Sequence, residues 1–243
     1  MRIKPLMKYN LITARFAVIV FYSCFMVGTV ISNVTIAATS PSTPHNTVSI
    51  VGFLFFVVVY NLTAPQKSSR MLIARSASRK EIFVSQILFM LPLSAFMAVL
   101  QIITLYAAGL LGSTLSRTEW TGLRFDLQTA IAPDMDNVLV FFAVSFSVFV
   151  CFSAIGYFVG ACISRWKWIT YSVLIVGSLV FFSCLLIPDF FTAVWEAIKF
   201  MLFDDDTAWF IVLKQLALAV PFVLAAFPII RRITAVSSST GSN

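Results

Sequence analysis

Long apolar runs separated by polar segments are the dominant pattern of this chain. Each run has about 20 residues, which as a helix crosses the hydrocarbon layer of one bilayer. The runs lack the period-2 alternation of barrel strands, and lipid offers no hydrogen-bond partner to an open backbone, so we expect helices. The pattern predicts six transmembrane spans, at residues 16–37, 48–64, 82–111, 138–163, 168–187 and 209–230.

These spans predict a single all-α, polytopic membrane domain over residues 1–236, followed by a disordered, serine-rich tail at 237–243. The third span is longer than one crossing requires and contains Pro92, which predicts a kink or an interfacial first turn. The first run is too long for the apolar core of a cleaved signal peptide, so we expect it to be retained as a helix. The pattern does not define a structure for the outer loop at 112–137.

The composition and the distribution of charge place this domain in a membrane. With 60% hydrophobic and 11% charged residues, the chain lacks the polar surface of a soluble domain. Thirteen of its 17 Lys and Arg residues fall in alternate polar segments, and nine of the ten acidic residues fall in the segments between them. Basic segments stay on the cytoplasmic side. Both termini are therefore predicted to be cytoplasmic, in a plasma membrane of bacterial type, and the net charge of +7 reflects topology, with no nucleic acid as a partner.

The densest basic segment, between the second and third spans, also carries helix signals. Met71, Leu72 and Arg75 follow helical spacing, and Ser78 with Glu81 three residues later has the pattern of a capping box. A short interfacial helix, a turn and the start of the third span are therefore predicted here. The charges alone also fit an ordinary inner loop that touches lipid headgroups.

Residues 74–83 have the sequence Ala-Arg-Ser-Ala-Ser-Arg-Lys-Glu-Ile-Phe. In this sequence, in its six spans and in its cytoplasmic ends, the chain resembles the permease (transmembrane) subunits of type 2 ATP-binding-cassette (ABC) exporters. The topological resemblance covers the whole chain. In that family a short helix in this loop docks in a groove of the ATPase subunit, and the next helix often begins with Ser or Thr followed by two basic residues. The resemblance implies the following ATPase-coupling residues: Arg70, Arg75, Ser78, Arg79, Lys80 and Glu81.

The resemblance implies a membrane-spanning subunit of an ATP-driven exporter, which forms half of a translocation pathway. Its partners would be a separate ABC ATPase subunit, a second permease subunit in a homodimer or heterodimer, and membrane lipids. The cargo would be an amphipathic peptide, a drug or a lipid-like molecule. The alternative is a non-transporting membrane scaffold or assembly factor that recruits a soluble partner. A pore fits poorly, because the spans offer few polar residues for an aqueous lining.

Motifs for catalysis or cofactor binding are missing from the sequence. None of the nine glycines belongs to a GxxxxGK[ST] phosphate loop, so ATP and Mg²⁺ are expected in the partner ATPase and no cofactor in this chain. The single histidine, His45, lies in an outer loop without a nearby cysteine, and no Ser/His/Asp or Cys/His set can be assembled. We therefore expect neither an enzyme active site nor a metal site.

The outer segment after the fifth span has helical periodicity. Asp189 is the predicted N-cap, and the apolar residues that follow fall on one face, which predicts an interfacial helix. The apolar face consists of Phe190, Phe191, Val194, Trp195, Ile198 and Leu202. By resemblance, this helix would shape the exit of the pathway; the other interpretation is a helix that rests on the lipid.

A few small and polar residues interrupt the spans. Gly156 and Gly160 form a GxxxG pattern that lets another helix approach closely, either within the chain or at a subunit interface. The polar side chains are candidates for the pathway or for hydrogen bonds between helices: Tyr60, Asn61, Gln101, Lys214 and Gln215. Lys214 lies two turns from the outer end of the sixth span, where its ammonium can reach the outer headgroups or an outer carboxylate.

Overall fold

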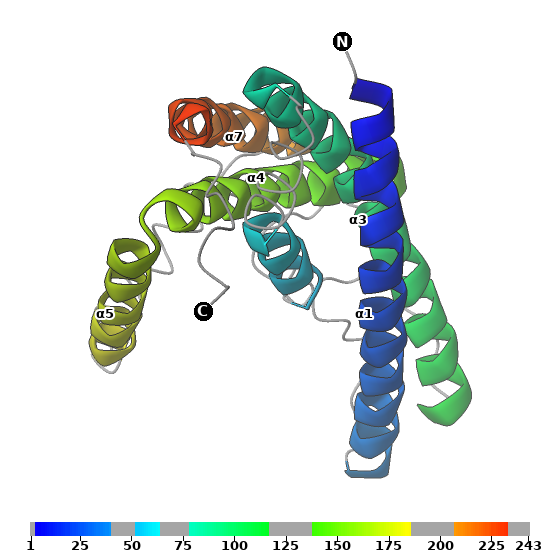
Figure 1. The fold of residues 1–243 in the computed structure, drawn as a ribbon. Coiled ribbons are helices and arrows are strands. Elements are labelled where there is room, and N and C mark those ends of the chain that lie inside the picture. The colour runs from blue at the N-terminus through cyan, green and yellow to red at the C-terminus, as the bar shows by residue number, and fades with distance from the viewer. Residues whose placement is uncertain (1–2, 40–51, 64–77, 117–137, 186–206, 233–243) are drawn as a thin grey trace, which may run out of the picture.

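The computed structural model describes residues 3–39, 52–63, 78–116, 138–185 and 207–232, which are almost entirely α-helical (Figure 1). The helices are α1 (Ile3–Thr39), the short helix Gly52–Thr63, α3 (Arg79–Ser116), α4 (Val138–Arg165), α5 (Lys167–Leu185) and α7 (Ala208–Arg231). These ranges contain no strand, so the predicted all-α class is confirmed for them.

Four helices in the described part of the chain are long and apolar enough to cross a membrane. They lie in α1, α3, α4 and α7 and correspond to the predicted first, third, fourth and sixth spans. At the predicted second span the structure has the shorter apolar helix Gly52–Thr63, and at the predicted fifth span it has the shorter apolar stretch Lys167–Leu179 within α5. The structure therefore supports a membrane-embedded, multi-pass protein.

Two helices extend beyond the predicted spans. α1 begins at Ile3 rather than at residue 16, and its first turns bury Leu6, Asn10 and Ala14 at a spacing of four residues. α3 covers Arg79–Ser116, whereas the predicted span covers residues 82–111. It remains helical through Pro92, which lies on an exposed side of the helix. The apolar run therefore underestimates α1, because polar turns at its start also pack against neighbours.

Hydrogen bonds between α1 and α3 show that these two helices run parallel. Near the start of both helices, the amide of Gln86 donates to Asn10 over 3.5 Å. Further along both, the hydroxyl of Thr104 bonds to that of Tyr22 at 3.4 Å. The two contacts advance in the same direction along each chain segment.

α4 and α7 also run parallel. Ser147 donates to the side-chain oxygen of Gln215 over 2.6 Å in the middle of both helices. At their ends, the guanidinium of Arg165 donates to the carbonyl oxygen of Arg232 over 3.0 Å. The sequence separation is 68 residues in the first pair and 67 in the second, so the register is constant along the pair.

The short helix Gly52–Thr63 runs parallel to α4, since Gly156 faces the backbone of Val58 and Gly160 that of Leu62. α3 runs in the opposite direction, because its first turn lies against the last turn of α7. α1 and α3 thus share one direction, and the short helix, α4 and α7 share the other. These relative directions are those that the predicted topology gives to the first, second, third, fourth and sixth spans.

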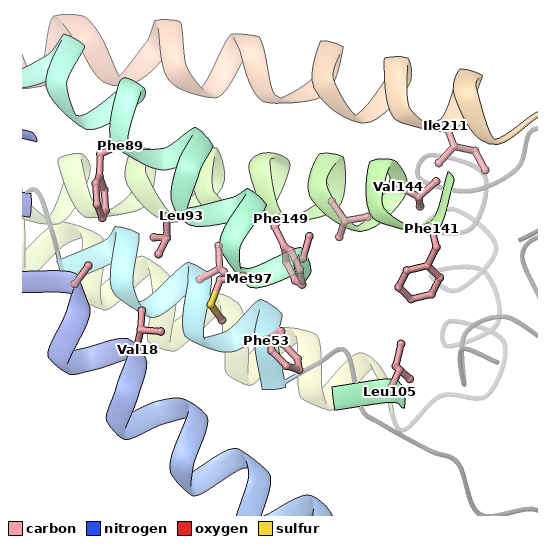
Figure 2. Packing of buried hydrophobic residues seen from close by; sticks show 14 residues of the cluster. Val18, Phe53, Phe89, Leu93, Met97, Leu105, Phe141, Val144, Phe149 and Ile211 are labelled. Carbon is pink, nitrogen blue, oxygen red and sulfur yellow. The ribbon is translucent and has the colours of Figure 1, made fainter. Parts of the chain in front are cut away.

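The main hydrophobic core lies where α1, the helix Gly52–Thr63, α3 and α4 meet (Figure 2). Phe53, Met97 and Phe149 are fully buried there, and the rings of Phe53 and Phe149 are 6.3 Å apart. A second cluster joins α3, α4 and α7 around Met90 and Tyr157. The second cluster includes Ile230, next to the last residue of α7, so it reaches the helix ends at which the candidate site lies.

The outward surfaces of the bundle are apolar. α5 leaves the bundle after the turn at Trp166 (Figure 1). Of the labelled helices it contacts α4 alone, and every residue from 171 to 179 is exposed. On α1 and α7, large side chains such as Phe16 and Leu213 are also exposed. Such surface is suited to lipid or to another membrane helix.

Candidate functional site at the basic end of the bundle

Three helix ends meet at one end of the bundle, where two arginines hold the C-terminus of α7. Arg79, from the first turn of α3, donates to the carbonyl oxygen of Arg231 over 2.5 Å. Arg165, from the last turn of α4, donates to the carbonyl oxygen of Arg232 over 3.0 Å. The last carbonyls of a helix have no intrahelical partner and carry partial negative charge, so guanidinium donors stabilise them.

The start of α3 has a capping box. The hydroxyl oxygen of Ser78 accepts from the backbone N–H of Glu81, and the Glu81 carboxylate accepts from the backbone N–H of Ser78, each over 3.2 Å. The backbone N–H of Ile82 adds a bond to the Ser78 carbonyl at 3.0 Å. The capping box predicted from the sequence is therefore confirmed, and it fixes where the chain enters α3.

The basic residues at these helix ends form one group, which we call the basic end. It comprises Arg79, Lys80, Arg165, Lys167, Arg231 and Arg232. Within the ranges that the structure describes, Glu81 is the one carboxylate, and the capping box engages it. The guanidinium of Arg165 also lies 5.0 Å from the ring centroid of Trp166, within the range of a cation–π contact.

Some predicted functional residues lie outside the described residues. Among the candidate coupling residues these are Arg70 and Arg75. The predicted outer interfacial helix also falls in this category, with Phe190, Phe191, Val194, Trp195, Ile198 and Leu202. Of the coupling set, the structure therefore places Ser78, Arg79, Lys80 and Glu81, all in the first turn of α3 or directly before it.

Asn61 belongs to a polar cluster between three helices. It is fully buried and donates to the carbonyl oxygen of Val57 over 2.9 Å and to the hydroxyl of Ser153 over 3.2 Å. Ser153 in turn bonds to the hydroxyl of Ser94 at 3.3 Å. The cluster thus joins the short helix Gly52–Thr63, α4 and α3 within the membrane-embedded part.

The other polar candidates take different positions. Gln215 is buried and bonds across to α4, while the hydroxyl of Tyr60 donates to the backbone carbonyl of Asn10 over 3.5 Å. Gln101 is buried, and its side-chain oxygen has no hydrogen-bond partner among the described residues. Lys214 is half-buried in the second turn of α7. Asn61 and Gln215 therefore hold helices together, at two separate points of the bundle.

Sequence reasoning missed the partners of these polar side chains. Asn10, Ser94, Ser147 and Ser153 are all buried and bonded to residues on other helices. The available signal was the presence of serines in apolar runs, since small polar residues in membrane helices are often used for bonds between helices.

Gly156 and Gly160 pack against a helix of the same chain. A Cβ atom at Gly156 would lie 2.7 Å from the carbonyl oxygen of Val58, and one at Gly160 would meet the carbonyl oxygen of Leu62. Both neighbours are backbone atoms of the helix Gly52–Thr63, so the absence of a side chain is what permits this approach. Of the two interpretations left open by the GxxxG pattern, this contact corresponds to packing within the chain.

The geometry as a whole is that of a helical bundle with a cationic end and buried hydrogen bonds that tie its helices together. Comparison of the chain with family models, with curated proteins and with solved structures found no match.

Proposed function

We propose that this chain is the membrane-spanning subunit of an ATP-driven exporter, and that the segment before α3, together with Lys80 of the basic end, binds a separate ATPase subunit in the cytoplasm. The basic end would then lie on the side that the positive-inside rule assigns to Lys and Arg. The chain would form half of the pathway and associate with a second permease subunit. Its cargo would be an amphipathic peptide, a drug or a lipid-like molecule.

The observation that carries this proposal is the hydrogen bond from Arg79 to the carbonyl oxygen of Arg231. A force applied to the chain just before α3 would reach the first turn of α3 through its capping box. From there the Arg79 bond would transmit it to the end of α7. A coupling mechanism requires such a physical link between the partner's binding surface and the helices that move.

Further contacts extend this link through the bundle. α7 is tied to α4 by Arg165 at its end and by the bond between Ser147 and Gln215 in its middle. α4 is in turn tied to the helix Gly52–Thr63 by close backbone contact at Gly156. We therefore propose that α3, through its Arg79 bond, moves these three parallel helices as one unit when the ATPases close.

Arg79 and Lys80 take different roles in this proposal. The guanidinium of Arg79 is engaged with α7, so it acts within the chain. Lys80 lies beside Arg79 and is exposed. We assign to Lys80 and Arg75 the contact with the surface of the ATPase. The same segment thus contains one residue for transmission and two for docking.

Co-purification with the candidate ATPase, encoded beside this chain and expressed together with it, tests these roles. The double variant Arg75→Ala/Lys80→Ala is expected to lose the ATPase, whereas Lys8→Ala, which removes an exposed cation from α1, serves as the control and is expected to retain it. Arg79→Gln is expected to retain the ATPase but to hydrolyse ATP without cargo stimulation. Undiminished association of the double variant with the ATPase would refute the docking role. If the unmodified complex forms but its ATP hydrolysis is not stimulated by cargo, the alternative of a non-transporting scaffold would be favoured.

Orientation is tested separately. A single cysteine at position 80, in a variant without the native cysteines, is expected to react with a membrane-impermeant maleimide only in inverted membrane vesicles. Reaction in intact cells would place the basic end outside and remove the basis of the proposal.

A further inference from the structure

The basic end holds more cations than its own contacts use. The two arginines that cap α7 are engaged with its carbonyl oxygens, and the Glu81 carboxylate is engaged in the capping box. The remaining cations have exposed side chains and no ion-pair partner within the described ranges: Lys80, Lys167, Arg231 and Arg232. These cations lie at helix ends that meet, and the one described carboxylate, Glu81, is engaged elsewhere, so this surface attracts anions.

Two tryptophans indicate the depth at which these cations lie. Trp166 and Trp168 flank Lys167 at the turn between α4 and α5, and Trp168 is 81% exposed. Tryptophan is enriched at the level of the lipid headgroups, where its ring is apolar and its N–H can still reach polar groups. These two rings would place Lys167 at the depth of lipid phosphates.

Apolar surface continues from the cations along two helices. Ile169, two residues after Lys167 on α5, is 65% exposed. Leu224, which precedes Arg231 by seven residues and thus by about 10 Å along α7, is 64% exposed. A ligand bound here would meet cations at one end and exposed aliphatic side chains at the other. This combination fits a phospholipid, with a phosphate and acyl chains, better than the polar surface of a soluble protein.

We propose that the turn between α4 and α5 and the end of α7 together bind the phosphate of an anionic phospholipid. Lys167, Arg231 and Arg232 contact the phosphate, and the acyl chains lie along the exposed faces of α5 and α7. Arg165 is a positioning residue: its bond to the Arg232 carbonyl and its contact with Trp166 hold the turn against the end of α7. This site is separate from the docking role proposed for Arg75 and Lys80, and it does not depend on the exporter proposal.

The test uses the full chain in phosphatidylcholine nanodiscs that contain a small fraction of spin-labelled phosphatidylglycerol or spin-labelled phosphatidylcholine. The preference for the anionic lipid is the ratio of their immobilised fractions. The variant Lys167→Gln/Arg232→Gln removes two side-chain charges and leaves the backbone carbonyl that Arg165 binds. Each Lys or Arg near a lipid surface contributes about fivefold to the binding of an anionic lipid, so the preference should fall by about fivefold per charge until none is left.

Two further variants make the test specific. Lys8→Gln/Arg15→Gln removes two exposed charges from α1, which has no contact with α7 in the described part of the chain, and should keep the preference. Lys167→Arg/Arg232→Lys keeps both charges and should also keep it, which distinguishes loss of the site from misfolding. Equal loss in the α1 variant would refute the site, because the preference would then follow total charge alone.

Two other results would assign the surface to different ligands and overturn the proposal. The first is displacement of the labelled lipid by an excess of inorganic phosphate, which would show that a free anion suffices. The second is an unchanged lipid preference in Lys167→Gln/Arg232→Gln, which would leave these cations to a different ligand.

Discussion

The contact of Gly156 and Gly160 with the helix Gly52–Thr63 predicts that replacement of glycine by alanine lowers the stability of the protein at these two positions but not at Gly177 on α5. In Gly156→Ala the new Cβ would lie 2.7 Å from the carbonyl oxygen of Val58 and 3.1 Å from its Cα. Ordinary contact begins at 3.4 Å, so the two helices must separate by about 0.7 Å. The neighbours are backbone atoms in a helix, and no side-chain rotation can relieve the overlap. Gly160→Ala has the same effect, against the backbone of Leu62.

The magnitude follows from two opposing terms. Overpacking costs about 1–3 kcal/mol per site, while replacement of a helical glycine by alanine returns up to about 1 kcal/mol. Separation of the helices would also lengthen the bond between Asn61 and Ser153, now 3.2 Å, which contributes on the order of 0.6 kcal/mol. We expect a loss of about 1 kcal/mol for Gly156→Ala and of about 2–3 kcal/mol for the double variant with Gly160→Ala.

Gly177 on α5 supplies the matched control, because a Cβ there has nothing within 4 Å. Gly177→Ala should leave stability unchanged or raise it by up to about 1 kcal/mol through helix propensity. The free energy of unfolding is measured by titration of the purified protein in mild detergent with sodium dodecyl sulfate, followed by circular dichroism. Equal effects at Gly156 and Gly177 would show that the close helix contact is absent and would refute the reasoning.

Three further predictions concern the hydrogen bonds between helices and at helix ends. Ser147→Ala and Gln215→Leu should show a coupling energy of about 0.6–1.7 kcal/mol in a double-mutant cycle of unfolding free energies, and additive effects would show that the 2.6 Å bond contributes nothing. Ser78→Ala should destabilise the start of α3 by about 1 kcal/mol, seen as faster hydrogen exchange of the amides in its first turn, with Glu81→Gln giving a smaller effect because an amide oxygen can still accept. Arg165→Gln removes a charged donor from the α7 carbonyl and should lengthen the mean distance between spin labels at the ends of α4 and α7. An unchanged mean distance would show that packing alone holds these ends together.

The helices themselves followed from local patterns in the sequence. Apolar runs of membrane length correspond to α1, α3, α4 and α7, and the pair Ser78 and Glu81 marked the start of α3. Both signals depend on residues close together in the chain, so no tertiary information was needed. The extension of α1 back to Ile3 was missed, because it depends on packing of Leu6 and Asn10 and not on hydrophobicity alone.

The contacts within the candidate site depended on the tertiary structure. The sequence marked Arg79 as a cation for a partner, whereas the structure directs it to a carbonyl oxygen 152 residues away. It marked Asn61 and Gln215 as polar, but their partners Ser153 and Ser147 lie 92 and 68 residues away and are ordinary serines in apolar runs. A polar residue in a membrane helix must find some partner, and only the packing decides which one.

By itself, the sequence determined that this chain forms apolar helices with basic residues at alternate ends, because hydrophobic length and charge act residue by residue on the choice between lipid and water. The tertiary structure alone decided that the ends of α3, α4 and α7 meet, that Gly160 accommodates a backbone and that four cations share one surface without an ion-pair partner among the described residues. These features arise from close packing between segments distant in the chain, which side-chain volumes and hydrogen-bond geometry select only when all helices are in place.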